Sequence, residues 1–181
     1  MRKIVIPIKD NLKIQSWLET DADELFNLVD RNREILQEWL IWVPQTKTEK
    51  DIETFISKCQ KEYERKTGFQ MGLWDGDELI GTIGLNNLDL ESKKASIGYW
   101  LSKTHQGKGA MTTATKALID YAFSVLDLNR IELKIASKNS KSKSIAERLG
   151  FKKEGTLRQE EYLSSEYHDY DIFSILRSDR N

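Results

Sequence analysis

A glycine-rich segment, HQGKGAMT (105–112), constrains the fold of this chain more than any other feature. The stretch before it, ASIGYWL (95–101), carries apolar residues at every second position, which predicts a β-strand. From Met111 onwards, apolar residues recur at helical spacing. Gly107 and Gly109 therefore remove side chains where a strand gives way to a helix. The first turn of a helix leaves backbone N–H groups without partners and carries partial positive charge, so this junction predicts an anion site.

The residue types in this segment indicate a phosphate or pyrophosphate, because Lys108 adds a full positive charge beside the free N–H groups. The segment does not match a P-loop, since Gly109, and not Ser or Thr, follows the lysine. It does not match the dinucleotide fingerprint either, because Thr112 stands where a third glycine belongs. From this loop alone, a plain glycine turn leading into a helix remains an open alternative.

The remaining patterns predict an α+β fold with a mixed, mostly antiparallel central sheet flanked by helices. One helix carries an apolar stripe of Ile52, Phe55, Ile56, Cys59 and Tyr63. The predicted elements are, in order, a strand at 12–18, helices after Asp21 or Asp23 and after Thr48, a hairpin of 69–74 and 78–85 with Asp75-Gly76 as its turn signal, the strand 95–101, a helix from within the glycine segment, a strand at 131–137, a helix capped by Asn139 and two strands, the last at 171–176.

Length and composition bound the organisation of the protein. A chain of 181 residues suits one domain, which we expect at 12–178, after an N-terminal arm at 1–11. The net charge is −1 and charges of both signs are interleaved, so nucleic acid is not expected as a partner. No apolar run approaches the ~18 residues that span a bilayer, so no membrane partner is expected.

The cysteine and histidine counts bear on location and metal content. Cys59 is the one cysteine, which excludes an internal disulfide and fits the cytoplasm. The N-terminus lacks the long apolar segment of a secretory signal. His105 and His168, with a single cysteine, do not make a standard zinc site, so we expect no metal.

The region around the glycine segment resembles the acyl-CoA-binding core of the GCN5-related N-acetyltransferase (GNAT) superfamily. Residues 97–123 contain its pattern Gln/Arg-x-x-Gly-x-Gly/Ala, matched by Gln106 and Gly109. Met111 departs from the commoner glycine or alanine. The same departure occurs in the RimJ/RimL-like branch, the ribosomal-protein-serine N-terminal acetyltransferases.

Two further segments resemble that branch. NSKSKSIAERLGF (139–151) is similar to its Asn-x-x-Ser segment, and LRQEEYLSSEYHD (157–169) is similar to its segment with an acidic residue before an aromatic-Leu pair. The resemblance covers about residues 12–178. It implies a GNAT-type sheet that is splayed at the acetyl-CoA site, acetyl-CoA as co-substrate, and a possible homodimer.

The resemblance also assigns the cofactor-binding residues. The strand residues would pair with the pantetheine amides, the loop would hold the pyrophosphate, and the residues of the Asn-x-x-Ser segment would contact the pantetheine arm or the thioester. The residues are Tyr99, Trp100, Leu101, Gln106, Gly107, Lys108, Gly109, Ala110, Met111, Thr112, Asn139 and Ser142. The charge run SKNSKSKS (137–144) could meet the adenosine 3′-phosphate or be a solvated face.

Two residues take catalytic roles by resemblance. Glu161 would be the base that removes a proton from the attacking amine, and Ser142 the acid toward the leaving sulfur. Glu160 is adjacent, but alternation in a strand would point it the other way. The alternatives remain open that Glu161 is a solvated strand residue and that Ser142 only caps a helix.

The acceptor is expected to be a primary amine. Trp39 and Trp42 lie in the segment that covers the acceptor side in this family, where they could wall a slot for a peptide end or fill the core. An α-amine has a pKa of ~8 and a lysine side chain ~10.4, so a weak base such as Glu161 suits a protein N-terminus better. The alternatives are a small amine (a polyamine or an aminoglycoside), a non-catalytic acyl-CoA-binding module and an unrelated phosphate-ligand protein.

Overall fold

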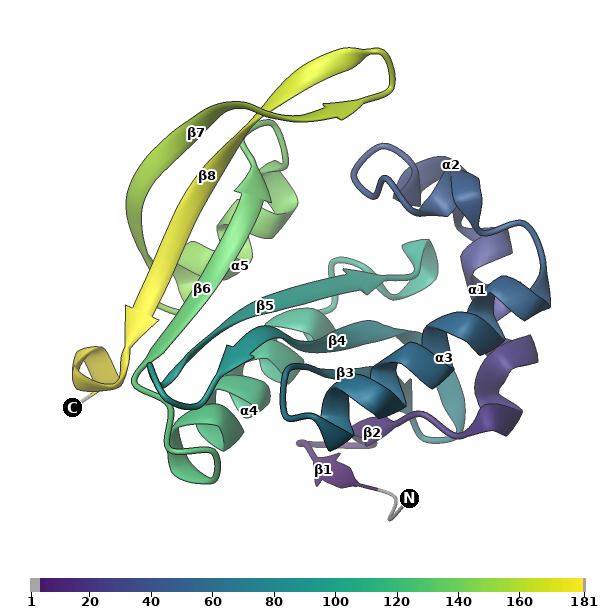
Figure 1. The fold of residues 1–181 in the computed structure, drawn as a ribbon, viewed down its shortest axis with the longest axis horizontal. Coiled ribbons are helices and arrows are strands. Elements are labelled where there is room, and N and C mark those ends of the chain that lie inside the picture. The colour runs from purple at the N-terminus through teal and green to yellow at the C-terminus, as the bar shows by residue number, and fades with distance from the viewer. Residues whose placement is uncertain (1–3, 181) are drawn as a thin grey trace.

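The computed structural model describes residues 4–180, which build one eight-stranded sheet with helices on both faces (Figure 1). The strand order is β1-β2-β3-β4-β5-β6-β8-β7, and neighbours are antiparallel except for β5 and β6. The strands are β1 (Val5–Pro7), β2 (Leu12–Ser16), β3 (Phe69–Asp75), β4 (Glu78–Asp89), β5 (Lys94–Leu101), β6 (Arg130–Ala136), β7 (Lys152–Leu163) and β8 (Glu166–Leu176). The predicted fold class is thus confirmed.

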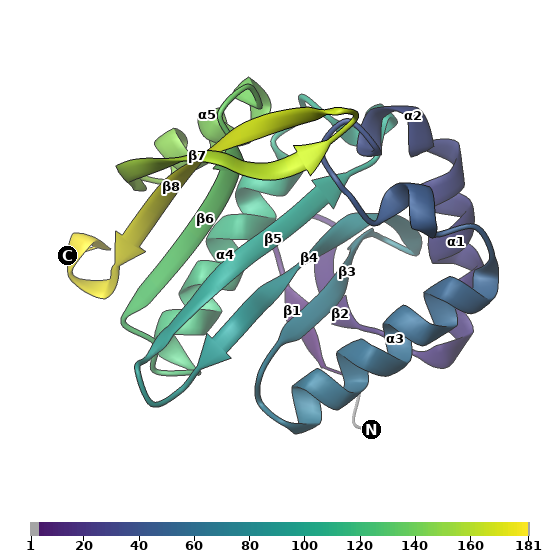
Figure 2. The ribbon, with the colours of Figure 1, turned by 45° about the horizontal axis from the view of Figure 1, so that its top comes forward.

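Five α-helices and four short 3₁₀ turns complete the described part of the chain. The helices are α1 (Ala22–Arg31), α2 (Arg33–Leu36), α3 (Glu49–Glu64), α4 (Ala110–Ser124) and α5 (Ser140–Arg148), and the 3₁₀ turns are η1 (Glu19–Asp21), η2 (Val43–Gln45), η3 (Lys103–His105) and η4 (Arg177–Arg180). Helices α1 and α3 cover one face of the sheet, and α4 lies on the opposite face (Figures 1 and 2).

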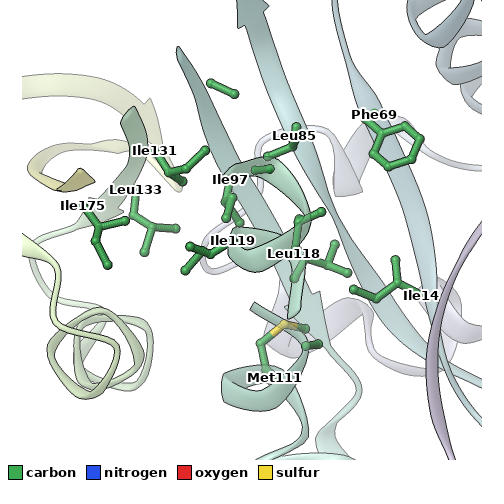
Figure 3. Packing of buried hydrophobic residues seen from close by; sticks show 14 of the residues in the cluster. Ile14, Phe69, Leu85, Ile97, Met111, Leu118, Ile119, Ile131, Leu133 and Ile175 are labelled. Carbon is green, nitrogen blue, oxygen red and sulfur yellow. The ribbon is translucent and has the colours of Figure 1, made fainter. Parts of the chain in front are cut away.

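The two faces of the sheet carry separate apolar cores. Alternation along β5 sends Ile97 to the core under α4 and Trp100 to the core under α1 and α3. Leu118 and Ile119 of α4 lie among aliphatic side chains of several strands (Figure 3). Leu118 is fully buried, and a buried leucine of this kind contributes about 1.5–3 kcal/mol to folding. The helical periodicity that follows the glycine segment therefore marks a true core face.

The local signals in the sequence placed most elements correctly. Thr48 precedes α3, and its N–H donates to the Asp51 carboxylate at 2.8 Å, as in a capping box. The β3–β4 turn lies one residue beyond the Asp75-Gly76 signal, because Asp75 pairs with Glu78 and leaves Gly76 as the first turn residue, at φ +59°.

The N-terminal segment differs from the predicted arm. Val5–Pro7 form β1, which pairs antiparallel with β2, and Ile6 is buried. The apolar contact of Ile6 offsets the entropy of ordering this segment, so the arm is a strand of the sheet there. Residues 1–3 of the predicted arm lie outside the described residues.

The sheet splays between β5 and β6. The two strands pair over only three residues each, from Lys94 with Arg130 to Ser96 with Glu132. Beyond this point β5 pairs only with β4 and β6 only with β8, and the ribbons diverge in Figure 1. The inner backbone edge of residues 97–101 is therefore open, and the predicted splay is confirmed.

Candidate active site

A cleft of about 910 Å³ opens where β5 and β6 diverge. Its walls come from β5, the loop and first turn of α4, β6, the length of α5, the end of α2 and the chain after it, and residues of β7 and β8. The lining of the cleft thus brings together segments that lie far apart in the sequence.

The glycine segment forms the turn at one end of this cleft. Gly107 has φ +77° and Gly109 has φ +83°, a left-handed conformation that glycine adopts without the steric cost of a Cβ atom. Gly109 is the N-cap of the 15-residue helix α4. A Cβ at either glycine would meet no atom within 4 Å, so the space beside them is open. The free N–H groups at this helix end can therefore receive an anion.

The cleft gathers all but one of the predicted cofactor-binding residues. Lys108 is exposed and lies outside the lining. The lining contains Tyr99, Trp100, Leu101, Gln106, Gly107, Gly109, Ala110, Met111, Thr112, Asn139 and Ser142.

Four cations that the sequence did not single out individually also line the cleft: Lys103, Lys134, Lys141 and Arg148. Lys141 and Arg148 project from α5, and Lys141 Nζ donates to Gln106 Oε1 at 2.9 Å. The charge run at 137–144 was the signal for Lys141. Arg148 had no signal, because its place depends on how α5 packs beside the loop.

Ser142 is held by two contacts in the first turn of α5. Its N–H donates to Asn139 Oδ1 at 3.0 Å, so the predicted cap is confirmed. Its Oγ lies 2.8 Å from the hydroxyl of Tyr99, which reaches from β5 across to α5. Burial raises the pKa of Tyr99 to about 12, so this phenol is neutral at pH 7 and can donate to Ser142.

A bulge in β7 aims Glu161 into the cleft. The register of β7 against β8 shifts between Leu157 and Glu161, and Gln159 takes φ +52° within the shift. The N–H of Gln159 donates to Asp169 Oδ1 at 2.8 Å, which stabilises the bulge.

The two neighbouring glutamates have different surroundings. Glu160 lies outside the cleft lining, and its Oε1 lies 2.5 Å from Lys134 Nζ. Glu161 lines the cleft, and its Oε2 accepts a hydrogen bond from the hydroxyl of Tyr170. The expected opposite orientation of the two side chains stays a prediction, because Lys134, the partner of Glu160, itself lines the cleft and lies against the Tyr170 ring. The sequence did not point to Tyr170, because the contact joins two strands.

Trp39 and Trp42, predicted to wall the acceptor slot, both line the cleft. Trp42 also packs against the core under α1 and α3, with its ring centroid 6.5 Å from that of Trp100. A second pocket of about 530 Å³ shares part of its lining with the cleft and is lined by residues of α2 and of the turn that joins β7 to β8. These two segments lie beside each other in the ribbon of Figure 2. Its lining is Glu34, Ile35, Gln37, Glu38, Pro44, Lys103, Leu163 and Ser164.

The buried carboxylate of Asp171 links β7 and β8 to the residue that follows β6. Asp171 is 4% exposed and accepts hydrogen bonds from Ser137 Oγ at 3.0 Å and Thr156 Oγ1 at 2.7 Å, with Lys153 Nζ at 2.8 Å. Burial alone would raise the pKa of Asp171, but the hydrogen bonds from Lys153, Thr156 and Ser137 outweigh it and hold the pKa below its usual value.

Because the folded-state pKa of Asp171 is lowered, its contribution to stability is present above the unfolded pKa of about 3.9 and is lost as the pH falls through the folded pKa. We expect Asp171→Asn to lower the free energy of unfolding at pH 7 by about 1.5–3 kcal/mol. The deficit should shrink as the pH falls through the lowered folded-state pKa of Asp171. Urea denaturation at a series of pH values from pH 7 downwards measures it, with Asp77→Asn, an exposed carboxylate, as the control. An equal deficit at all pH values would contradict the argument.

Neither the cysteine nor the potential metal ligands of residues 4–180 add a second reactive site. Cys59 is buried in α3, and burial raises the pKa of its thiol to about 12, which does not suit a nucleophile. No group of three or more His, Cys, Asp or Glu side chains within residues 4–180 could hold a metal ion. Over the same range, no helix combines the length and the apolar character needed to cross a bilayer.

Comparison with known proteins agrees with this geometry. An acetyltransferase (GNAT) domain family model matches residues 11–152. YdaF of Bacillus subtilis (strain 168), whose name proposes a ribosomal N-acetyltransferase, is 35% identical over 94% of this chain and 93% of its own. The ribosomal-protein-serine acetyltransferase of Escherichia coli (strain K12) is 31% identical over 93% of this chain and 94% of its own.

A solved structure extends the likeness to three dimensions. The RimL ribosomal L7/L12 α-N-protein acetyltransferase in complex with coenzyme A is 26% identical, with a TM-score of 0.93 over 96% of this chain and 98% of that chain. With a matching family model, relatives that align over nearly their whole length and a shared architecture, the chain belongs to the GNAT acetyltransferase family.

Proposed function

We propose that this protein is an acetyl-CoA-dependent N-acetyltransferase whose acceptor is the α-amine of a protein N-terminus. The observation that supports this most strongly is that Glu161, Ser142 and the left-handed glycine turn line one cleft beside the open edge of β5. The cleft offers an anion site, a strand edge, a carboxylate and a hydroxyl within one volume. The relatives named for ribosomal-protein acetylation support the same reading of the acceptor.

The residues of the cleft fit coenzyme A in shape and charge. The N–H groups at Gly109 and the first turn of α4 suit the pyrophosphate, and Lys141 and Arg148 add positive charge near it. The open edge of residues 97–101 suits the pantetheine amides, which can pair as an added strand does. When bound, acetyl-CoA would supply the activated acetyl thioester.

The chain's own groups would manage the protons by direct attack in a ternary complex. Glu161 would accept a proton from the acceptor amine, directly or through a water, so that a neutral nitrogen can attack the thioester carbonyl. The Ser142 hydroxyl would donate to the departing sulfur, and the Tyr99 hydroxyl would donate to Ser142 in turn. A backbone N–H near Tyr99 or Trp100 would stabilise the oxyanion.

The acceptor chain would leave through the second pocket. This pocket shares Ile35, Glu38 and Lys103 with the cleft wall, so a peptide whose amine lies at Glu161 could continue between α2 and the β7–β8 turn. Trp39 and Trp42 would form the wall of the slot for the first residue. Glu34 and Glu38 also give this side an acidic character, so a polyamine acceptor belongs in the assay.

The test compares acceptors of one sequence. We expect coenzyme A release from acetyl-CoA with a peptide that has a free Ser N-terminus, and none with the same peptide when it is N-blocked but keeps its lysine. At pH 7, removing the proton from a lysine side chain costs about 3.4 kcal/mol more free energy than removing it from an α-amine. Release with the blocked peptide would indicate lysine acetylation, and release only with spermidine would indicate a small-amine enzyme. Binding of acetyl-CoA with no release to any acceptor would indicate a binding module.

The organisation of the protein is part of the same proposal. Residues 12–178 act as one catalytic domain, in the cytoplasm, where the single Cys59 stays reduced. The protein acts as a homodimer, and the exposed edge strand β7, with Leu157 and Tyr162 at its surface, is available to a second copy. Size-exclusion chromatography with light scattering measures this state.

A further inference from the structure

The carboxylate of Glu161 is held by a tyrosine from the neighbouring strand. Glu161 lies opposite His168 in the β7–β8 pairing, and Tyr170 lies two residues further along β8, on the same face. The Tyr170 hydroxyl donates to Glu161 Oε2. Among the hydrogen bonds and ion pairs of residues 4–180, this is the one contact of the Glu161 side chain. Because Oε2 is engaged, Oε1 is the oxygen left for the acceptor amine or a water.

Tyr170 is itself fixed in place. It is 8% exposed, and its backbone pairs with Ala136 on one side and Leu157 on the other. Lys134 Nζ lies 5.1 Å from the centroid of the Tyr170 ring, which adds a cation–π contact. A ring packed this way gives the hydroxyl a defined position at the rim of the cleft.

The nearby cation, Lys134, is paired with the neighbouring glutamate. Lys134 Nζ lies 2.5 Å from Glu160 Oε1, so the lysine charge is neutralised by the neighbouring glutamate. A lysine on Glu161 would oppose proton uptake by its carboxylate, because a cation favours the charged form more strongly than a neutral donor does. Burial, followed by the hydrogen bond and charge of Glu161, raises the pKa of Tyr170, so its phenol stays a neutral donor.

We propose that Tyr170 is a positioning residue for the acetyl transfer, because its hydroxyl fixes the Glu161 carboxylate with one oxygen aimed into the cleft. This role rests on the proposed function of Glu161 as the base. The register of β8 against both β6 and β7 sets the geometry, so the bulge of β7 and the tyrosine of β8 act together on one side chain.

The test is Tyr170→Phe, which removes only the hydroxyl. We expect kcat with the free N-terminal peptide to fall about 10–160-fold, the size of a lost hydrogen bond to a charged group, while KM for acetyl-CoA stays unchanged. The split between a lowered kcat and an unchanged KM for acetyl-CoA is the readout that a merely structural role would not give. The control is Tyr167→Phe, also on β8, where the ring is 61% exposed.

A double-mutant cycle separates positioning from other roles. In the Glu161→Gln background, Tyr170→Phe should have little further effect on kcat. An undiminished effect there would mean that Tyr170 contacts the substrate independently, which overturns the proposal. An equal loss of kcat and of acetyl-CoA affinity would also overturn it. Thermal denaturation and acetyl-CoA calorimetry confirm that each variant is folded.

The same data distinguish this proposal from the proposed function. If the unsubstituted protein acetylates the peptide and Glu161→Gln is slow but Tyr170→Phe is as fast as Tyr167→Phe, the positioning role fails and the function of Glu161 stands. If Glu161→Gln itself is as fast as the unsubstituted protein, the base assignment fails, and the Tyr170 proposal fails with it.

Discussion

Replacing Glu161 by glutamine is expected to lower kcat at pH 7 by about 10²–10³-fold, the range in which a general base contributes. Glutamine keeps the size of the side chain but cannot take a proton from the acceptor amine. Acetyl-CoA affinity should not change, because the carboxylate faces the acceptor side of the cleft. The measurement is the rate of coenzyme A release at saturating acetyl-CoA with the free N-terminal peptide.

The matched control for this substitution is Glu160→Gln. Glu160 is the neighbouring residue on β7 and lies outside the cleft lining; its loss frees Lys134 but leaves the Glu161 carboxylate in place, so kcat should fall far less than in Glu161→Gln. The deficit of Glu161→Gln should also shrink above pH 8, where an α-amine with a pKa of about 8 is already neutral. Equal rates for the two variants would disprove Glu161 as the base.

Substituting Gly109 by alanine is expected to weaken acetyl-CoA binding by about 100-fold or more. At φ +83° a Cβ costs roughly 1–2 kcal/mol, so the N-cap should relax away from this conformation and misplace the N–H groups of the first turn. Loss of two charge-assisted hydrogen bonds to a pyrophosphate, at about 1.5–3 kcal/mol each, accounts for this size of effect. Isothermal titration with acetyl-CoA measures the dissociation constant.

The control for Gly109→Ala is Gly150→Ala. Gly150 has φ +81°, nearly the same backbone conformation, and its added Cβ would also meet open space, but it follows α5 outside the cleft lining. Both variants should lose similar stability on thermal denaturation, and only Gly109→Ala should lose affinity. Unchanged affinity in Gly109→Ala would mean that the coenzyme pyrophosphate binds elsewhere.

The candidate site was predictable where its residues carry short-range signals. Gly107 and Gly109 predicted a glycine turn before a helix, and Asn139 predicted the N-cap of the helix that carries Ser142. The roles of Glu161 and Ser142 came from resemblance to a family, since no local pattern distinguishes a catalytic carboxylate or hydroxyl from a solvated one.

Other parts of the site carried no such signal. Tyr170 lies on a different strand from Glu161, and Arg148 reaches the cleft only because α5 packs beside β6. The second pocket exists because α2 and the β7–β8 turn, more than a hundred residues apart in the chain, face each other. Lys108, the most obvious charge in the segment, is exposed outside the lining.

The sequence by itself determined the types and order of the main elements, since the 2.0 and 3.6 periodicities, the caps and the left-handed glycines depend on interactions within a few residues. Tertiary structure alone decided which side chains meet. The three-residue pairing of β5 with β6 opens the cleft, the bulge of β7 aims Glu161, and the register of β8 places Tyr170 against it. These features depend on packing and strand pairing across the whole sheet, and a local sequence pattern does not determine the free energy of those interactions.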